Sequence, residues 1–114
     1  MMKKYNILFG GARLLAYRCN LVESLIGLMF RNLKNNECML IKFPDFKVNA
    51  IHMIFVFFKI DVFWLDEKFK IVEITRNVKP FSIYTNSKVK SKYALEIRAG
   101  IIKKNTLRQV VKFK

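Results

Sequence analysis

The sequence has few of the residues that build disulfide-bonded, metal-bound or fibrous proteins. Among its 114 residues are 2 cysteines, 1 histidine, 4 glycines and 2 prolines. Two cysteines make no disulfide framework, and a structural zinc site needs four nitrogen or sulfur ligands. So little glycine and proline excludes collagen-like and low-complexity segments. We expect Cys19 and Cys38 to be buried thiols, with one disulfide between them as the alternative, and we expect no metal and no cofactor.

No apolar run is long enough for a transmembrane helix. The longest uncharged stretch is 48–58, and Lys59 and Asp61 interrupt the wider apolar zone. A spanning helix needs about 20 apolar residues. The N-terminal stretch begins with two lysines, as a signal peptide does, but Arg13 interrupts it and no small-residue cleavage site is clear. We therefore expect a cytoplasmic protein without a membrane span.

Acidic residues are scarce, with 8 Asp and Glu against 22 Lys and Arg, which gives a net charge of +14. This excess favours attraction to a polyanion, either nucleic acid or an anionic membrane. However, the basic residues are scattered from Lys3 to Lys114 without a long block. Such scatter is also typical of a lysine-rich composition bias. The charge alone therefore does not establish that the protein binds a polyanion.

Apolar and aromatic residues are plentiful, at 53% and 14% of the chain. A disordered protein does not have this composition. A chain of 114 residues is the size of one domain and can bury one hydrophobic core. We therefore expect a single folded domain over residues 1–114.

Short apolar or alternating runs, separated by turn signals, predict strands along most of the chain. The pattern over 38–43 and 92–98 alternates, which predicts half-buried strands. The side chains expected to face inward on the first strand are Met39, Ile41 and Phe43, and those expected to face outward on the two strands include Leu40, Ala94 and Glu96. Residues 51–57 are almost continuously apolar, as in a strand buried on both faces. Gly10-Gly11 predicts a hairpin turn between the first two strands. The turn at 66–68 predicts a second hairpin, between 61–65 and 70–76. The expected strands are 1–9, 12–19, 38–43, 51–57, 61–65, 70–76, 92–98 and 110–113, with a possible helical turn over 101–105.

One helix is expected, over 21–30. Asn20 is a good N-cap, and Glu23 follows three residues later, as in a capping box. Gly27 within this helix predicts close approach of another backbone. Arg31 at its end complements the helix dipole. Seven or eight strands with one early helix predict a mainly β fold: an antiparallel β-sandwich or small barrel, jelly-roll-like, with one short N-terminal helix.

Four polar residues are candidates for one ligand-binding site: Arg31, His52, Asp61 and Glu96. His52 lies in an apolar stretch, where it is either a core residue or a polar group at a pocket mouth. Asp61 also interrupts an apolar zone, and it is either a structural cap or a site carboxylate that needs a cation or hydrogen bonds. Glu96 is either solvated or part of the site. Acid–base chemistry would require these side chains to converge.

Sequence motifs with a known mechanism are absent. Gly10-Gly11 is a lone pair and no phosphate-binding loop follows it. The chain has no G-x-S-x-G and no H-E-x-x-H. We therefore assign no catalytic residue and lean against an enzyme.

The order of five segments resembles the family called domain of unknown function 192, over about residues 12–114. These segments are GLMFR at 27–31, ECMLIKF at 37–43, HM at 52–53, IDVFWLD at 60–66 and KYALEIRAG at 92–100. The resemblance implies a mainly antiparallel β fold of sandwich or jelly-roll type, and it implies no established activity. It marks as structural-motif residues Gly27, Met29, Met39, Met53 and Gly100.

The chain departs from the family pattern at three places. His52-Met53 stands where many members have Trp-Met, which indicates an archaeal-type member. Arg98 stands where many have proline. Arg108-Gln109 replaces a Gly-Asp pair, which puts the closing turn in doubt.

The function that these observations favour is a non-enzymatic binding module for a small ligand or a protein partner. The first alternative is nucleic-acid binding through the basic surface. The second is an enzyme that uses Asp61, Glu96 and His52.

Overall fold

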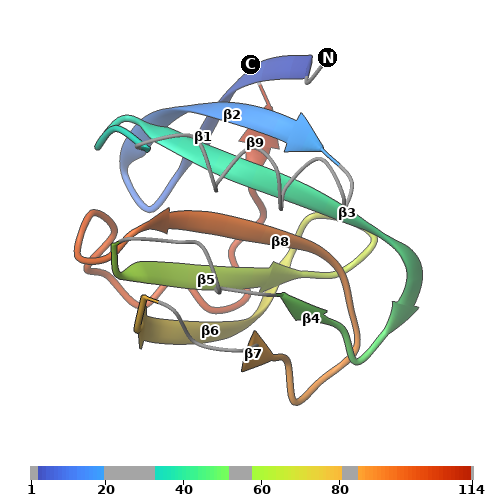
Figure 1. Cartoon of the computed structure of the whole chain (residues 1–114). Coiled ribbons are helices and arrows are strands. Elements are labelled where there is room, and N and C mark those ends of the chain that lie inside the picture. The colour runs from blue at the N-terminus through green and yellow to red at the C-terminus, as the bar shows by residue number, and fades with distance from the viewer. Residues whose placement is uncertain (1–2, 20–32, 52–57, 81–84, 114) are drawn as a thin grey trace.

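The computed structural model describes residues 3–19, 33–51, 58–80 and 85–113, and these form a curled, mainly β structure (Figure 1). None of these residues is helical, and the helix expected over 21–30 lies outside them. The strands are β1 Lys3–Phe9, β2 Ala12–Cys19, β3 Glu37–Lys47, β4 Ala50–Ile51, β5 Ile60–Leu65, β6 Ile71–Val78, β7 Thr85–Asn86, β8 Ser91–Arg98 and β9 Lys112–Phe113.

Seven strands make one sheet in the order β6-β5-β8-β3-β2-β1-β9, and β4 pairs with β7 in a separate ribbon. The β1–β2 and β5–β6 hairpins are antiparallel, as expected. The β2–β3 pair is parallel. The predicted antiparallel arrangement therefore does not hold at this pair, and the chain between Cys19 and Glu37 is long enough for the crossover connection that parallel strands require.

The C-terminal segment bridges the two edges of the curled sheet. On one side, Ile71 at the start of β6 exchanges backbone hydrogen bonds with residues 108–109, and Val111 donates its N–H to Phe69. On the other side, Lys112 in β9 pairs with Leu8 in β1. The curled sheet is thus tied across its open side by the last strand, which lies beside β1 in Figure 1.

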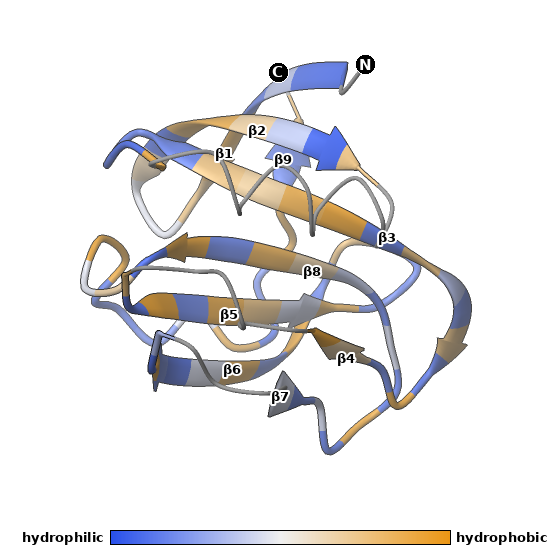
Figure 2. Cartoon of the chain, in the orientation of Figure 1, coloured by the Kyte–Doolittle hydropathy of each residue, from blue (hydrophilic) through white to orange (hydrophobic). Residues whose placement is uncertain are grey.

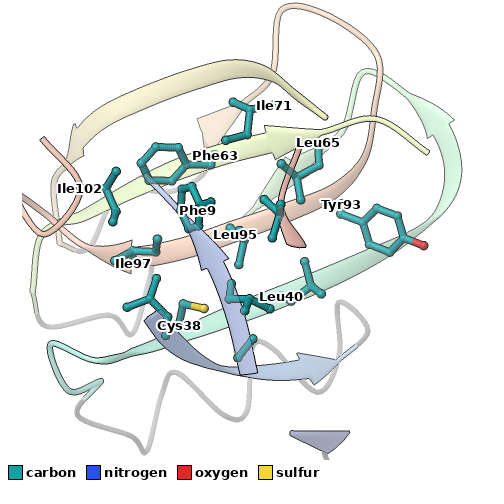
Figure 3. Packing of buried hydrophobic residues seen from close by; sticks show 14 residues of the cluster. Phe9, Cys38, Leu40, Phe63, Leu65, Ile71, Tyr93, Leu95, Ile97 and Ile102 are labelled. Atoms are coloured by element: carbon teal, nitrogen blue, oxygen red, sulfur yellow. The ribbon is translucent and has the colours of Figure 1, made fainter. Parts of the chain in front are cut away.

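Both faces of the sheet carry apolar side chains, because alternate residues of a strand point to opposite faces. We call the face enclosed by the curl and by the C-terminal segment the inner face (Figure 3). Its core contains Ile7, Phe9, Leu14, Ala16, Cys38, Leu40, Phe63, Leu65, Ile71, Tyr93, Leu95, Ile97, Ile102 and Val111. The outer face carries Tyr17, Cys19, Leu33, Met39, Ile41, Phe43, Ile51, Ile60, Val62, Trp64, Val78 and Ala94.

This double burial corrects the prediction that 38–43 and 92–98 form half-buried strands. Leu40 and Ala94, both expected to face outward to solvent, are fully buried. Glu96, expected on the same solvent side, is 1% exposed. Figure 2 shows apolar colour along most of β5. Strands at the middle of this sheet are therefore buried on both faces.

Three local expectations also change. The strand expected to end at Phe43 continues to Lys47, and its pairing with β8 shifts register between Lys42 and Lys47, an irregularity that accommodates Pro44. The strand expected over 51–57 is described only as β4, and residues 52–57 lie outside the described part. The helical turn expected over 101–105 is irregular chain.

The two cysteines are buried and free, which confirms the thiol prediction. Cys19 lies on the outer face and Cys38 on the inner face. Burial, with a smaller contribution from the charge of Glu37, raises the pKa of the Cys38 thiol far above its ordinary value. Cys38 is therefore an inert packing residue.

In the ranges that the structure describes, no helix has the length and apolar character to cross a membrane.

Candidate functional site

Asp61 and Glu96, the two candidate carboxylates that the structure describes, lie on opposite faces of the sheet. Asp61 is paired with Ile97 and Glu96 with Val62 across the same β5–β8 ladder. Ile97 belongs to the inner core and Val62 to the outer core. Because neighbouring residues of a strand alternate in direction, the two carboxyl groups do not converge. Arg31 and His52 lie outside the described residues, as do Gly27, Met29 and Met53.

Asp61 is 2% exposed, and hydrogen bonds engage both of its carboxylate oxygens. Its Oδ1 accepts the Asn77 N–H at 2.8 Å, and its Oδ2 accepts the Gly100 N–H at 3.1 Å. Arg76 Nη1 also donates to Oδ2 at 3.1 Å. Arg76 of the neighbouring strand β6 therefore supplies the cation that a buried carboxylate needs.

Arg76 carries this network further along the chain. Its guanidinium donates to the carbonyl oxygens of Ile102 and, at 2.9 Å, of Lys104, and lies 5.2 Å from the Phe63 ring centroid. Asp61 and Arg76 together fasten β5 and β6 to the chain that follows β8. The structural interpretation of Asp61 explains every contact it makes.

Glu96 is in a different environment, at the centre of the outer face. It lies on β8 between Met39 of β3 and Val62 of β5. Within the described part of the chain, its Oε2 is buried and has no hydrogen-bond partner. Burial among apolar side chains raises the pKa of Glu96 to about 8, because desolvation disfavours the charged form. Glu96 is therefore a neutral carboxylic acid at pH 7.

Glu37 lies on the same face, two residues before Met39, and is 8% exposed. Its Oε2 accepts the Tyr17 hydroxyl at 2.6 Å, and its Oε1 accepts the Lys34 N–H at 3.0 Å. The Tyr17 bond is short, as charge-assisted O–H···O⁻ bonds are. Glu37 thus supplies a second, hydrogen-bonded carboxyl group beside Glu96.

Arg98 completes this group at the end of β8. It is two residues beyond Glu96, on the same face, and directly follows Ile97, which pairs with Cys38, the neighbour of Glu37. Its Nε donates to the Leu33 carbonyl, and its guanidinium lies 4.3 Å from the Phe58 ring centroid. We call Tyr17, Glu37, Glu96 and Arg98 the outer-face polar cluster.

Sequence reasoning identified Glu96 and missed its three neighbours. The signal for Glu37 was present, because it has the same strand parity as Met39, Ile41 and Phe43, which were expected inward. Tyr17 gave no such signal, since only the parallel pairing of β2 with β3 brings it to Glu37. Met39 and Gly100, the described motif residues, have structural roles: Met39 packs in the outer core, and Gly100 has a φ of 87° in the turn after β8.

Metal ligands do not gather in this cluster. Across the described ranges, no group of three or more His, Cys, Asp and Glu side chains could hold a metal ion. One shallow pocket of about 360 Å³ lies elsewhere, between the start of β6 and the C-terminal segment. Lys70, Leu107 and Arg108 line it.

Two solved structures share this fold. One is a proposed transcription regulator from Sinorhizobium meliloti 1021, with a TM-score of 0.84 and 18% identity over 99% of this chain and 94% of that chain. The other is a protein of unknown function from Novosphingobium aromaticivorans DSM 12444, with a TM-score of 0.76 and 18% identity over 97% of this chain and 84% of that chain. At these identities the likeness shows the fold alone.

A search of curated proteins finds no match. The profile of DUF192, whose description is "Uncharacterized ACR", matches residues 19–112, which is most of the sequence. This range contains β3 and β8, the strands that carry Glu37, Glu96 and Arg98, whereas Tyr17 of β2 lies just before it. The chain belongs to the DUF192 family of uncharacterized proteins.

Proposed function

We propose that the protein is a non-enzymatic binding module that holds a small ligand at the outer-face polar cluster. The observation that carries the proposal is the buried Oε2 of Glu96, which has no partner within the described part of the chain. A buried polar atom without a hydrogen bond costs about 1–3 kcal/mol, so such atoms are rare in native proteins. A ligand that bonds this oxygen removes that cost, which gives the site its affinity.

The chemistry of the cluster selects the ligand class. Glu96 is neutral, because burial raises its pKa to about 8, so its carboxyl group offers one O–H donor and one acceptor oxygen. The cluster also contains one acidic residue, Glu37, and one basic residue, Arg98, so its formal net charge is zero when Glu96 is neutral. A matching ligand is therefore small and uncharged, with a donor and an acceptor side by side, as in a primary amide.

An enzyme that uses Asp61, Glu96 and His52 is not favoured by this arrangement. Asp61 is on the inner face and bonded to Arg76, whereas Glu96 is on the outer face. A general acid and a general base must both reach the same substrate. The binding proposal needs only one of these two carboxyl groups.

Nucleic-acid binding through the whole basic surface also has less support. Exposed basic residues of the described chain occur on separate elements, for example Lys4 on β1, Lys42 on β3 and Lys104 after β8. A nucleic-acid interface typically gathers its basic residues on one face. The Sinorhizobium meliloti protein is described as a proposed transcription regulator, but at 18% identity its role does not transfer.

The test is a ligand screen by ¹H–¹⁵N NMR, with acetamide, propionamide, acetate and glycerol as probes. We expect the amides to shift the resonances of β3 and β8 around Met39 and Glu96 in a saturable way. Glu96→Leu, which fills the site with an apolar side chain, should abolish the shifts. Glu67→Gln is the matched control, because Glu67 is an exposed acid in the β5–β6 turn.

The proposal fails if no probe gives saturable shifts on the outer face. It also fails if Glu96→Leu binds the amides as the unmodified protein does.

A further inference from the structure

Two turns lie side by side at one end of the molecule, at the lower right of Figure 1. One joins β3 to β4 and the other joins β7 to β8. Lys47 at the end of β3 pairs with Ser91 at the start of β8, which fixes the two turns next to each other. We call residues 45–48 and 88–90 together the tip.

The tip combines exposed apolar and basic side chains. Phe46, Val48 and Val89 are 40%, 50% and 45% exposed. These apolar residues alternate along the chain with exposed lysines: Lys47, Lys88 and Lys90. Asp45 is the one acidic residue of the tip. Exposed apolar and positively charged side chains therefore alternate along both segments of the tip.

The backbone of the tip is held in place by hydrogen bonds. The buried amide of Asn49 donates through Nδ2 to the carbonyl oxygens of Asp45, Lys47 and Ser91. The N–H groups of Lys88 and Val89 both donate to Glu73 Oε1, at 2.7 and 3.1 Å. The exposed side chains are thus presented on a fixed frame, which lowers the entropic cost of binding.

We propose that the tip docks on the surface of an anionic lipid bilayer. Apolar side chains that enter the interface, together with lysines that reach the headgroups, are the combination that peripheral membrane binding uses. Each lysine near an anionic leaflet adds electrostatic attraction, and its long apolar stem lets the charged end stay at headgroup level. The charge of the tip complements such a surface.

The side chains of the tip fit nucleic acid less well. Single strands stack on aromatic platforms, and Phe46 is the one aromatic residue of the tip. Base edges are read by side chains that donate and accept hydrogen bonds. The amide and hydroxyl side chains of Asn49, Ser87 and Ser91, next to the tip, are at most 6% exposed and are engaged in the internal network, which leaves lysines as the exposed donors of the tip.

A protein partner is also a poorer match. The centres of protein–protein interfaces are enriched in aromatic residues, Met and Arg, and depleted in Lys. The tip has three lysines, two valines and no arginine or methionine.

The experiment is cosedimentation of the full chain with phosphatidylcholine vesicles, with and without phosphatidylglycerol. We expect binding to the anionic vesicles at least about tenfold tighter than to the neutral ones, decreasing with salt. The triple variant Phe46→Ser, Val48→Ser, Val89→Ser should lose about tenfold or more on the anionic vesicles. Replacing the three tip lysines by glutamine should abolish the preference for phosphatidylglycerol.

The matched control is Leu107→Ser with Val110→Ser, because these side chains are 45% and 51% exposed but lie outside the tip. This control should bind as the unmodified protein does, and thermal melting should show that each variant folds. The proposal is overturned if the control loses as much binding as the tip variant, or if anionic vesicles are bound no better than neutral ones. Binding of labelled duplex or single-stranded DNA that depends on the tip lysines, without vesicle binding, also overturns it.

Discussion

At the scale of single residues, Glu96 and Asp61 show how two buried carboxyl groups of one β5–β8 ladder differ. Asp61 has three hydrogen-bond donors, one of them a guanidinium. Glu96 has an oxygen without a partner in the described chain, and its pKa is raised by burial. Sequence patterns place both residues in apolar stretches, but they do not show which of the two carboxyl groups forms hydrogen bonds in the folded protein.

The raised pKa of Glu96 predicts a specific dependence of stability on pH. In the unfolded chain this group ionises near 4.5, whereas in the folded protein it stays protonated to about 8. The contribution of protonated Glu96 to the free energy of unfolding is therefore fully present below pH 4.5. This contribution declines as the pH rises to about 8. The decline is roughly 1.4 kcal/mol per pH unit, or about 4–5 kcal/mol in total.

Glu96→Gln should remove this decline, since glutamine does not ionise. We expect the free energy of unfolding of the variant relative to the unmodified protein to rise by about 3–5 kcal/mol from pH 4.5 to pH 8. Denaturant unfolding of both proteins over this range measures the difference. A difference that stays constant with pH would show that Glu96 ionises normally in the folded protein.

Asp61→Asn should destabilise the fold by about 2–4 kcal/mol, because it removes the charge that Arg76 faces and one acceptor from a buried site. The expected loss in the free energy of unfolding is moderate because Arg76 is 32% exposed and remains partly hydrated. Asp45→Asn, at an exposed position, should change stability by less than about 0.5 kcal/mol. Urea unfolding compares the two, and equal losses would contradict the anchoring role of Asp61.

At the scale of elements, the strands with a clear pattern were predicted well. The hairpin around Gly10-Gly11, the β5–β6 hairpin and the strand that becomes β8 all occur as expected. What failed was the assignment of faces. The alternating pattern predicted that one face of β3 and of β8 is exposed to solvent. A lysine or glutamate in a strand does not reveal whether neighbouring elements cover the face on which it lies.

The turn of the first hairpin gives a prediction at this scale. Gly10 has a φ of 58°, and a Cβ added there would lie 2.8 Å from Ile102 Cγ2 and 3.1 Å from Thr106 Cγ2. Gly10→Ala therefore combines backbone strain with a clash, and it should cost roughly 2–4 kcal/mol.

Gly100→Ala is the matched control for this substitution. Gly100 also has a positive φ, of 87°, but an added Cβ would meet nothing within 4 Å. Gly100→Ala should therefore destabilise the fold by the backbone strain alone, roughly 1–2 kcal/mol. Thermal unfolding of both variants separates the two contributions, and a Gly10→Ala protein as stable as Gly100→Ala would refute the close contact with Ile102.

At the scale of the whole molecule, the pairing and direction of the strands are the features that the sequence predicts least. No local pattern indicates that β2 and β3 are parallel, or that the last strand pairs with β1 at the other end of the chain. These contacts depend on the curvature of the entire sheet. They also bring Tyr17 beside Glu37, which no local pattern of the sequence indicates.

The bridging role of the C-terminal segment predicts that its buried valine supports both edges of the sheet. Val111 is 3% exposed in the inner core, whereas the neighbouring Val110 is 51% exposed. Val111→Ala should cost roughly 1–3 kcal/mol and Val110→Ala close to nothing. Amide hydrogen exchange should then speed up at Leu8 and at Ile71. If protection from exchange falls only at Leu8 or only at Ile71, the C-terminal segment does not bridge the two edges of the sheet.

The central claim is that the outer face carries a buried, neutral carboxylic acid ready to bond a ligand. The most direct measurement is the titration of the Glu96 side-chain carboxyl carbon by ¹³C NMR, assigned by comparison with Glu96→Gln. The account predicts a protonated signal at pH 7 and a midpoint near pH 8. A midpoint at the ordinary glutamate value of about 4.3 would show an ionised, hydrated group and would contradict the account.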